Sequence, residues 1–181
     1  YLAAVFHREA VGREMASPAS GALDLRAVQS PLTPPRYEGI TLPLPELLAA
    51  ANGIGGISVD PDEDGILRRV STTFSYQGRL YPSLSLAAAL ADGTVNPPGI
   101  RAIDVQNRRG VVPLDDDGMI LLRWRGGAQT FAYVPAWRVL RSYGQIVRGE
   151  TPEIPPETFR DKVGFIGATV SGAFEFRSTP F

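Results

Sequence analysis

Short apolar runs alternate along the chain with polar segments rich in Gly and Pro. Several runs are rich in Val, Ile, Leu and aromatic residues and are bounded by turn residues, a pattern typical of β-strands. The expected strands are Leu2–Phe6, Ile54–Val59, Ile66–Tyr76, Ile103–Gln106, Val111–Leu114, Met119–Trp124 and Val163–Gly167. The last of these carries no charge, so we expect it at the centre of a sheet, covered on both faces.

Three segments have the features of helices. Pro45–Asn52 begins with Pro, has an acidic residue in its first turn and is followed by Gly53 as a stop. Pro82–Ala91 has Ser83 as a capping residue and Leu and Ala positions for a buried face. A third, short helix is expected at Ala136–Leu140.

Turn residues set the expected connections. Gln77-Gly78 is a turn signal, and Asn107–Gly110 and Asp115–Gly118 favour an antiparallel meander of the strands from Ile103 to Trp124. Residues 12–37 contain several Pro residues, which fix φ and remove backbone donors, so we expect a long surface loop there.

These elements predict a mixed α/β (α+β) fold with a central mixed sheet, flanking helices and Pro/Gly-rich loops. We expect the sheet to contain Val163–Gly167 and Met119–Trp124, with the Pro82–Ala91 helix packed against it. The length of 181 residues fits a single domain spanning 1–181.

The amino-acid composition excludes several classes of function. Lys+Arg is 18 and Asp+Glu is 19, so the net charge is -1 and the basic excess of a nucleic-acid-binding protein is absent. Cys is 0 and His7 is the single histidine, which excludes thiolate chemistry and zinc sites that need two or three His ligands. Gly53-Ile-Gly55-Gly56 fails the dinucleotide fingerprint, because its third Gly position holds Ser58 and no helix follows, and we expect no cofactor. No apolar run reaches the roughly 20 residues of a membrane-spanning helix.

Two interpretations of the acidic segment Asp60–Gly65 stay open. Asp60, Asp62, Asp64 and Gly65 match the first half of an EF-hand calcium loop, but Ser71 stands where the bidentate Glu is required. The alternative is a strand-connecting turn in which Asp caps and Gly supplies positive φ, and this interpretation is favoured.

Arg68 and Arg69 follow this segment just inside an expected strand. Alternation along a strand predicts that their side chains point to opposite faces, so that one could bind an anion. The alternative is a pair of ordinary surface or salt-bridged arginines, which is the favoured interpretation on this evidence alone.

The C-terminal block offers the strongest candidate for a ligand site. A buried strand at Val163–Gly167 would leave room at its carboxyl edge, where ligands bind in α/β sheets. Hydroxyls and both charges follow at Thr169, Ser171, Glu175, Arg177 and Thr179. A tight packed turn with capping hydroxyls explains the same residues equally well.

Four blocks in order resemble the type-two CHASE family, the extracellular sensor domains associated with cyclases and histidine kinases. They are Asp62–Val70, Tyr81–Leu86, Ile120–Gly126 and Phe159–Thr169 with the close Arg177-Ser-Thr-Pro180. The resemblance is best over 53–181, is loose before Asn52, and lacks the family's N-terminal portion. Asp161 stands where the family usually has Gly, and Glu175 stands where it usually has Asp.

The resemblance implies a non-catalytic, extracytoplasmic sensor domain of a bacterial inner-membrane receptor. It implies membrane spans on both sides of these residues and a cytoplasmic cyclase, kinase or similar output. It supplies no binding residues, so Arg68, Arg69, Thr169, Glu175, Arg177 and Thr179 are candidates from position alone. The expected partner is an unidentified small molecule, and two copies could form a homodimer. The alternatives are a carboxylate-dependent hydrolase and a calcium-binding or dimerisation module.

Overall fold

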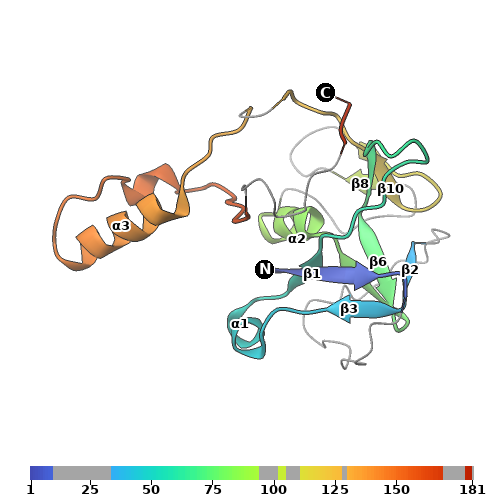
Figure 1. Ribbon diagram of the computed structural model, residues 1–181, viewed down its shortest axis with the longest axis horizontal. Helices are drawn as coiled ribbons and strands as arrows, with labels where there is room; N and C mark the ends of the chain where they lie inside the picture. The colour runs from blue at the N-terminus through green and yellow to red at the C-terminus, as the bar shows by residue number, and fades with distance from the viewer. Residues whose placement is uncertain (10–33, 94–101, 105–110, 128–129, 169–177, 181) are drawn as a thin grey trace. The chain divides into compact units, whose positions relative to one another are not determined.

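The computed structural model describes residues 1–9, 34–93, 102–104, 111–127, 130–168 and 178–180. The chain divides into two compact units (Figure 1). Unit 1 comprises Tyr1–Leu122 and Arg177–Pro180, and unit 2 comprises Arg123–Phe176 and Phe181. Both sheets and helices are present, so the mixed α+β prediction is confirmed.

Unit 1 is built around two three-stranded sheets. In the first, β1 (Leu2–His7) lies between β3 (Gly39–Thr41), which is antiparallel to it, and β4 (Ile54–Gly56), which is parallel. In the second, β6 (Thr73–Tyr76) lies between β2 (Arg36–Tyr37), which is parallel, and β7 (Arg79–Pro82), which is antiparallel. Both sheets are therefore mixed.

The hairpin between β6 and β7 forms as predicted. Gln77 has φ 47° and Gly78 has φ 72°, and Tyr76 pairs directly with Arg79. Two central residues with positive φ match the twist of the flanking strands, which explains why the turn signal was reliable here.

Two further strand pairs complete unit 1. β8 (Ala102–Asp104) pairs with β9 (Val111–Pro113), as the predicted meander requires. The next strand, β10 (Met119–Leu121), pairs with β5 (Arg69–Ser71) instead of β9. The second hairpin of the predicted meander is therefore wrong, because a turn sequence reverses the chain without specifying which strand completes the ladder.

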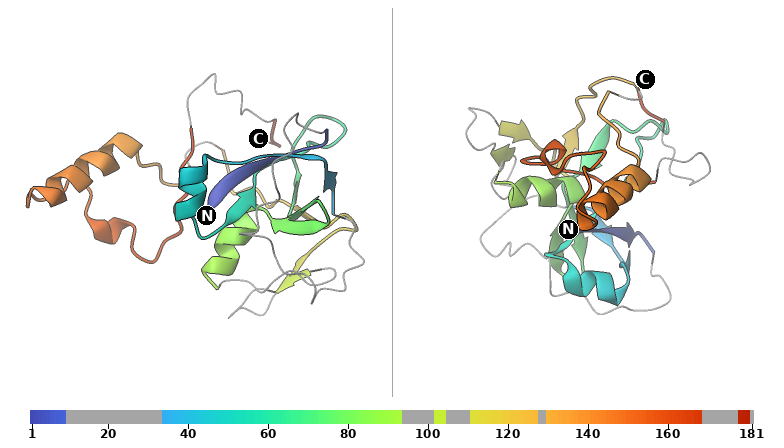
Figure 2. Two further views of the ribbon diagram at one scale, coloured as in Figure 1. Left: turned by 90° about the horizontal axis from the view of Figure 1, so that it is seen from below. Right: turned by 90° about the vertical axis from the view of Figure 1, so that its left-hand side faces the viewer.

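The helices of unit 1 agree closely with the prediction. α1 (Pro45–Ala50) has Pro at its start and Glu46 in its first turn, and it lies near the N-terminus in both views of Figure 2. α2 (Leu84–Ala91) is capped by Ser83, whose hydroxyl accepts a hydrogen bond from the Leu86 amide at 3.2 Å. α2 contacts β4 and β7, and its Leu86 forms a second hydrophobic cluster with Leu114, against which Ile120 of β10 packs. The helix therefore packs near the Met119–Trp124 segment, as predicted.

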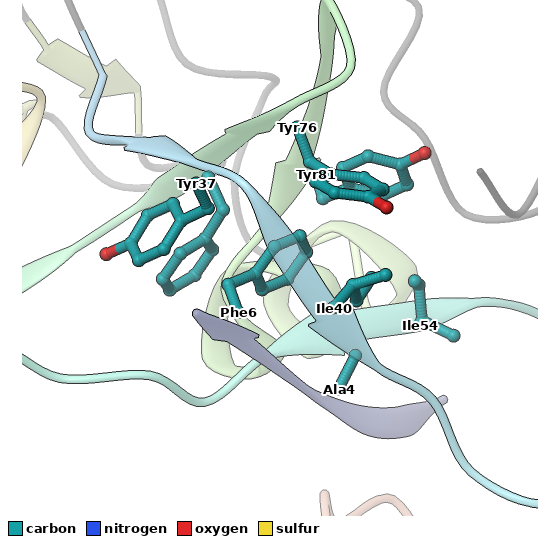
Figure 3. Close-up of a cluster of buried hydrophobic side chains, with 8 residues drawn as sticks. Ala4, Phe6, Tyr37, Ile40, Ile54, Tyr76 and Tyr81 are labelled. Carbon is teal, nitrogen blue, oxygen red and sulfur yellow. The ribbon is translucent and has the colours of Figure 1, made fainter. Parts of the chain in front are cut away.

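The core of unit 1 lies between the two sheets and is largely aromatic. Phe6 stacks on Phe74 with ring centroids 4.8 Å apart, and Tyr37, Tyr76 and Tyr81 surround them (Figure 3). The other buried members of this cluster are Ala4, Ile40 and Ile54. Burial of these rings removes the largest apolar side chains of the two sheets from water and fixes the sheets against each other.

Unit 2 contains α3 (Ala136–Val147) and a 3₁₀ turn, η2 (Pro156–Thr158). The predicted helix Ala136–Leu140 is correct but too short, because the helix continues through Gly144 to a Schellman-type end at Gly149, which has φ 74°. The segment after the helix folds back along it. Ser142 Oγ accepts the Ile154 amide at 2.9 Å, and Arg138 pairs with Glu153 at 2.7 Å.

The predicted central strand Val163–Gly167 is wrong. Residues 162–168 form no strand, and Ile166 is fully exposed at 100%. An apolar run favours burial but does not supply a partner strand, and Gly164 and Gly167 weaken the strand tendency of this one.

The predicted loop at 12–37 lies outside the described residues up to position 33, and its last two residues form the short strand β2. Among the described residues, no helix has the length and apolar character needed to cross a membrane.

Candidate functional site

The acidic segment Asp60–Gly65 forms the strand-connecting turn that the sequence favoured. The Gly65 amide donates to the Asp62 carbonyl at 2.8 Å, and the Asp62 amide donates to the Ile66 carbonyl at 3.1 Å. Gly65 has φ 79° with open space around it, so the backbone conformation alone requires glycine here. The turn places four carboxylates before β5, three from Asp and one from Glu63.

Arg68 and Arg69 both contact this turn. Arg68 donates to both carboxylate oxygens of Asp64, at 2.9 and 2.8 Å, and lies 3.3 Å from Asp62 Oδ2. Arg69 donates to Asp62 Oδ1 at 2.9 Å and lies 3.7 Å from Asp115. We call these five residues the acid–arginine cluster.

The predicted divergence of the two arginines is therefore wrong. Strand β5 begins at Arg69, so Arg68 lies before the alternating part of the chain. Both side chains are long enough to turn back to the same Asp62 carboxylate, which is only 17% exposed. The favoured interpretation, salt-bridged arginines, is what the structure shows.

The ion pairs of Asp62 and Asp64 with the two arginines stay ionised at neutral pH. Hydrogen bonds from Arg69 and then Arg68 lower the pKa of Asp62, and Arg68 lowers the pKa of Asp64 to about 2. The same bonds raise the pKa of both guanidinium groups. An anionic ligand would have to compete with Asp62 and Asp64 for these arginines, and their role as ligand contacts stays a prediction.

Asp60 belongs to a separate group of side chains. It pairs with Arg8 and accepts a hydrogen bond from the Tyr37 hydroxyl at 3.3 Å, while Arg8 lies 4.7 Å from the centre of the Tyr37 ring. Burial first, and then the negative charge of Asp60, raise the pKa of Tyr37 to about 12. This group connects the acidic turn to the aromatic core through Tyr37.

The three Asp residues of the EF-hand-like segment therefore bind different partners. Asp60 faces Arg8 and Tyr37, whereas Asp62 and Asp64 face Arg68 and Arg69. Within the part of the chain that the structure describes, no three His, Cys, Asp or Glu side chains form a group that could hold a metal ion.

Of the candidate ligand-binding residues near the C-terminus, the structure describes only Thr179. Thr169, Glu175 and Arg177 lie outside the described residues, as does Ser171. Thr179 is described and follows Ser178, which forms a parallel β-bridge with Ile66. The structure thus brings the Thr179 segment beside the chain that leads into Arg68 and Arg69, far away in sequence.

Sequence reasoning missed three members of this region: Arg8, Tyr37 and Asp115. Arg8 and Tyr37 are ordinary residues at strand ends, and no local pattern marks them. Asp115 was assigned to a turn, where its carboxylate does accept the amides of Asp117 and Met119. Only the pairing of β10 with β5 explains why this turn also lies close to Arg69.

The chain thus has a mixed α+β fold, and the acidic and basic side chains of its acid–arginine cluster pair with one another. The profile of the CHASE2 domain family matches residues 2–181, and the chain belongs to this family of extracellular sensory domains. The match includes residues 2–52, where the sequence showed only a loose resemblance. No curated protein and no solved structure gave a match to the chain.

Proposed function

We propose that this chain is a non-catalytic, extracytoplasmic ligand-sensing domain of a bacterial transmembrane signalling receptor. The observation that carries the proposal is the CHASE2 match over residues 2–181, because this is a family of sensory extracellular domains. The receptor's output would be a cyclase, a histidine kinase or a similar domain outside these residues.

The charge states of Asp62 and Asp64 speak against these two residues as the acid of a carboxylate-dependent hydrolase. The carboxylates of Asp62 and Asp64 are held ionised by Arg68 and Arg69. A carboxylate-dependent hydrolase needs one carboxyl group that keeps a proton near neutral pH, and a lowered pKa opposes that role.

The ligand in this proposal is an unidentified small molecule. Thr169, Glu175, Arg177 and Thr179 are the proposed contacts, with Arg68 or Arg69 nearby. In the full-length protein, Arg177→Ala should flatten the output signal across growth conditions while the circular dichroism spectrum of the 181-residue chain stays unchanged. An unchanged signal range, or a loss of fold, would count against this site.

The coding sequence on both sides of these 181 codons tests the receptor context. The proposal expects an apolar span of about 20 residues before the domain, further spans after it and a signalling output domain. A gene that encodes the domain alone, or within a soluble enzyme, would contradict the transmembrane receptor part of the proposal. The homodimer expected from the sequence stays a prediction, which sedimentation of the 181-residue chain would test.

A further inference from the structure

One side of α3 in unit 2 carries large apolar side chains that are mostly exposed. Trp137, Leu140, Tyr143 and Val147 recur every three or four residues, so they share one side of the helix. Their exposed fractions are 60, 70, 66 and 68%. We call these four residues the α3 apolar face.

The segment that follows α3 packs on the other side of the helix. Ser142 Oγ accepts the Ile154 amide at 2.9 Å, and Gln145 Oε1 accepts the Glu153 amide at 2.9 Å. Ser142 is only 3% exposed. It follows Leu140 by two positions, which is about 200° around a helix, so the two side chains point in nearly opposite directions. The described part of unit 2 therefore covers the polar side of α3 and leaves its apolar face open.

Positive charge borders the α3 apolar face. Arg141 follows Trp137 by four residues and is therefore its neighbour on the helix surface. The Arg141 side chain is 62% exposed, and it lies 3.9 Å from Glu153, which pairs more closely with Arg138. Between positions 123 and 168, seven residues are Arg or Lys and four are Asp or Glu, a net charge of +3, whereas the whole chain has -1.

The size and composition of this face favour a lipid surface over a second copy of the chain. Its four side chains expose on the order of 500 Å², less than the roughly 800 Å² per partner that a stable dimer buries. A bilayer needs no matching shape. Helices with Trp, Tyr and Leu on one side and Arg beside them lie in the membrane interface, with the cations near the phosphates.

We propose that α3 docks parallel to the surface of an anionic lipid bilayer. Leu140 and Val147 enter the boundary between headgroups and acyl chains, and Arg141 lies at the level of the lipid phosphates. This inference goes beyond the proposed sensing function, which would place the domain beside such a bilayer but assigns no residues to it.

Trp137 reports docking directly. The sequence has two tryptophans, so Trp124→Phe leaves Trp137 as the single emitting indole of the 181-residue chain. We expect the emission of an exposed indole in buffer and a shift to shorter wavelength on vesicles of phosphatidylglycerol and phosphatidylcholine. The shift should be smaller on vesicles of phosphatidylcholine alone, because these lack the negative surface potential.

Flotation of the chain with both tryptophans measures binding to the same vesicles. Leu140→Glu should weaken binding about tenfold or more, because it removes a large apolar contact and adds negative charge. Arg141→Gln should weaken binding to the anionic vesicles roughly fivefold and leave binding to phosphatidylcholine vesicles unchanged. Leu44→Glu is the matched control: Leu44 lies in unit 1, is 67% exposed, and should be replaceable without effect.

Three results would overturn the proposal. A buried-indole emission of Trp137 in buffer would show that the protein itself covers the face. A dimer in sedimentation that Leu140→Glu dissociates would show that a second copy covers it. Equal flotation of Leu140→Glu and Leu44→Glu, or no flotation of the wild-type chain, would show that the face binds no bilayer. The assays use the isolated chain, so they are independent of the flanking coding sequence that tests the receptor proposal.

Discussion

The packing of α2 on β4 leads to a quantitative prediction at Gly55. A Cβ at this position would overlap the Leu84 Cα and would lie 2.8 Å from the Leu84 backbone nitrogen. The obstacle is the backbone at the start of α2, which cannot rotate away as a flexible side chain would. Gly55→Ala must therefore lift the first turn of α2 from β4. Overpacking of this kind costs about 1–3 kcal/mol, and we expect the upper half of that range because backbone must move.

Urea denaturation followed by circular dichroism measures this cost. With a slope of about 2 kcal/mol/M, a loss of about 2–3 kcal/mol lowers the urea midpoint by about 1–1.5 M. Gly164→Ala is the matched control, because a Cβ there has nothing within 4 Å, and its effect should stay within about 0.5 kcal/mol. A urea midpoint of Gly55→Ala that lies within about 0.3 M of the wild-type midpoint would refute the packing of α2 against β4.

Three further predictions concern single side chains. Ser83→Ala removes the cap on the Leu86 amide and should cost about 0.5–2 kcal/mol in urea denaturation, whereas Ser83→Gly should cost less than Ser83→Ala. The folded pKa of Tyr37, about 12, lies above the unfolded value of about 10, so stability should fall as the pH rises from about 10 to 12, and Tyr37→Phe should remove this part of the loss. The folded pKa of Asp64, about 2, lies below the unfolded value of about 3.9. The stability that Asp64 contributes is therefore present above about pH 4 and should be lost as the pH falls to about 2. Asp64→Asn should reduce this loss of stability at low pH, and so should high salt. Each is measured by the urea midpoint as a function of the stated condition, and an unchanged midpoint contradicts it.

Local signals in the sequence predicted most elements of unit 1. Ser83 as a cap and Pro45 in a first turn have direct physical effects on helix starts. The first helix begins at Pro45 as predicted, and the second begins at Leu84, directly after its cap and two residues later than predicted. Gln77-Gly78 supplies two residues with positive φ, so the hairpin was also predictable. These predictions depend on interactions within a few residues of chain.

The pairing of strands was less predictable because it depends on residues far apart in sequence. The Asp115–Gly118 turn was correct, yet β10 pairs with β5 and not with the strand before the turn. Val163–Gly167 was apolar enough for a central strand, but the structure gives it no partner and leaves Phe165 65% exposed. An apolar run reports a tendency to burial and not the identity of the surface that covers it.

In the candidate site, too, contacts between residues close in sequence were predictable and contacts between distant residues were not. Arg68 and Arg69 were identified correctly as charged residues beside an acidic turn, and their local partners Asp62 and Asp64 lie within seven positions in the chain. The contact of Arg8 with Asp60 spans 52 positions, and no sequence pattern indicated it. The bridge between Ile66 and Ser178 joins positions that are further apart still, so only the folded structure brings Ser178 beside the segment that leads into Arg68.

Labelling of a surface cysteine from outside the cell tests directly whether this domain is extracytoplasmic. The chain has no native cysteine, so a single cysteine can be placed at Glu46, which is exposed on α1. Ala87→Cys, at a position only 1% exposed in unit 1, is the buried control. Both variants are made in the full-length protein, with any cysteines outside these 181 residues replaced by Ser.

Intact cells are then treated with a membrane-impermeant maleimide. We predict that Glu46→Cys is labelled in intact cells, whereas Ala87→Cys is labelled only after the protein is unfolded. Labelling of Glu46→Cys that requires lysis of the cells would place the domain in the cytoplasm and would contradict the extracytoplasmic sensor function.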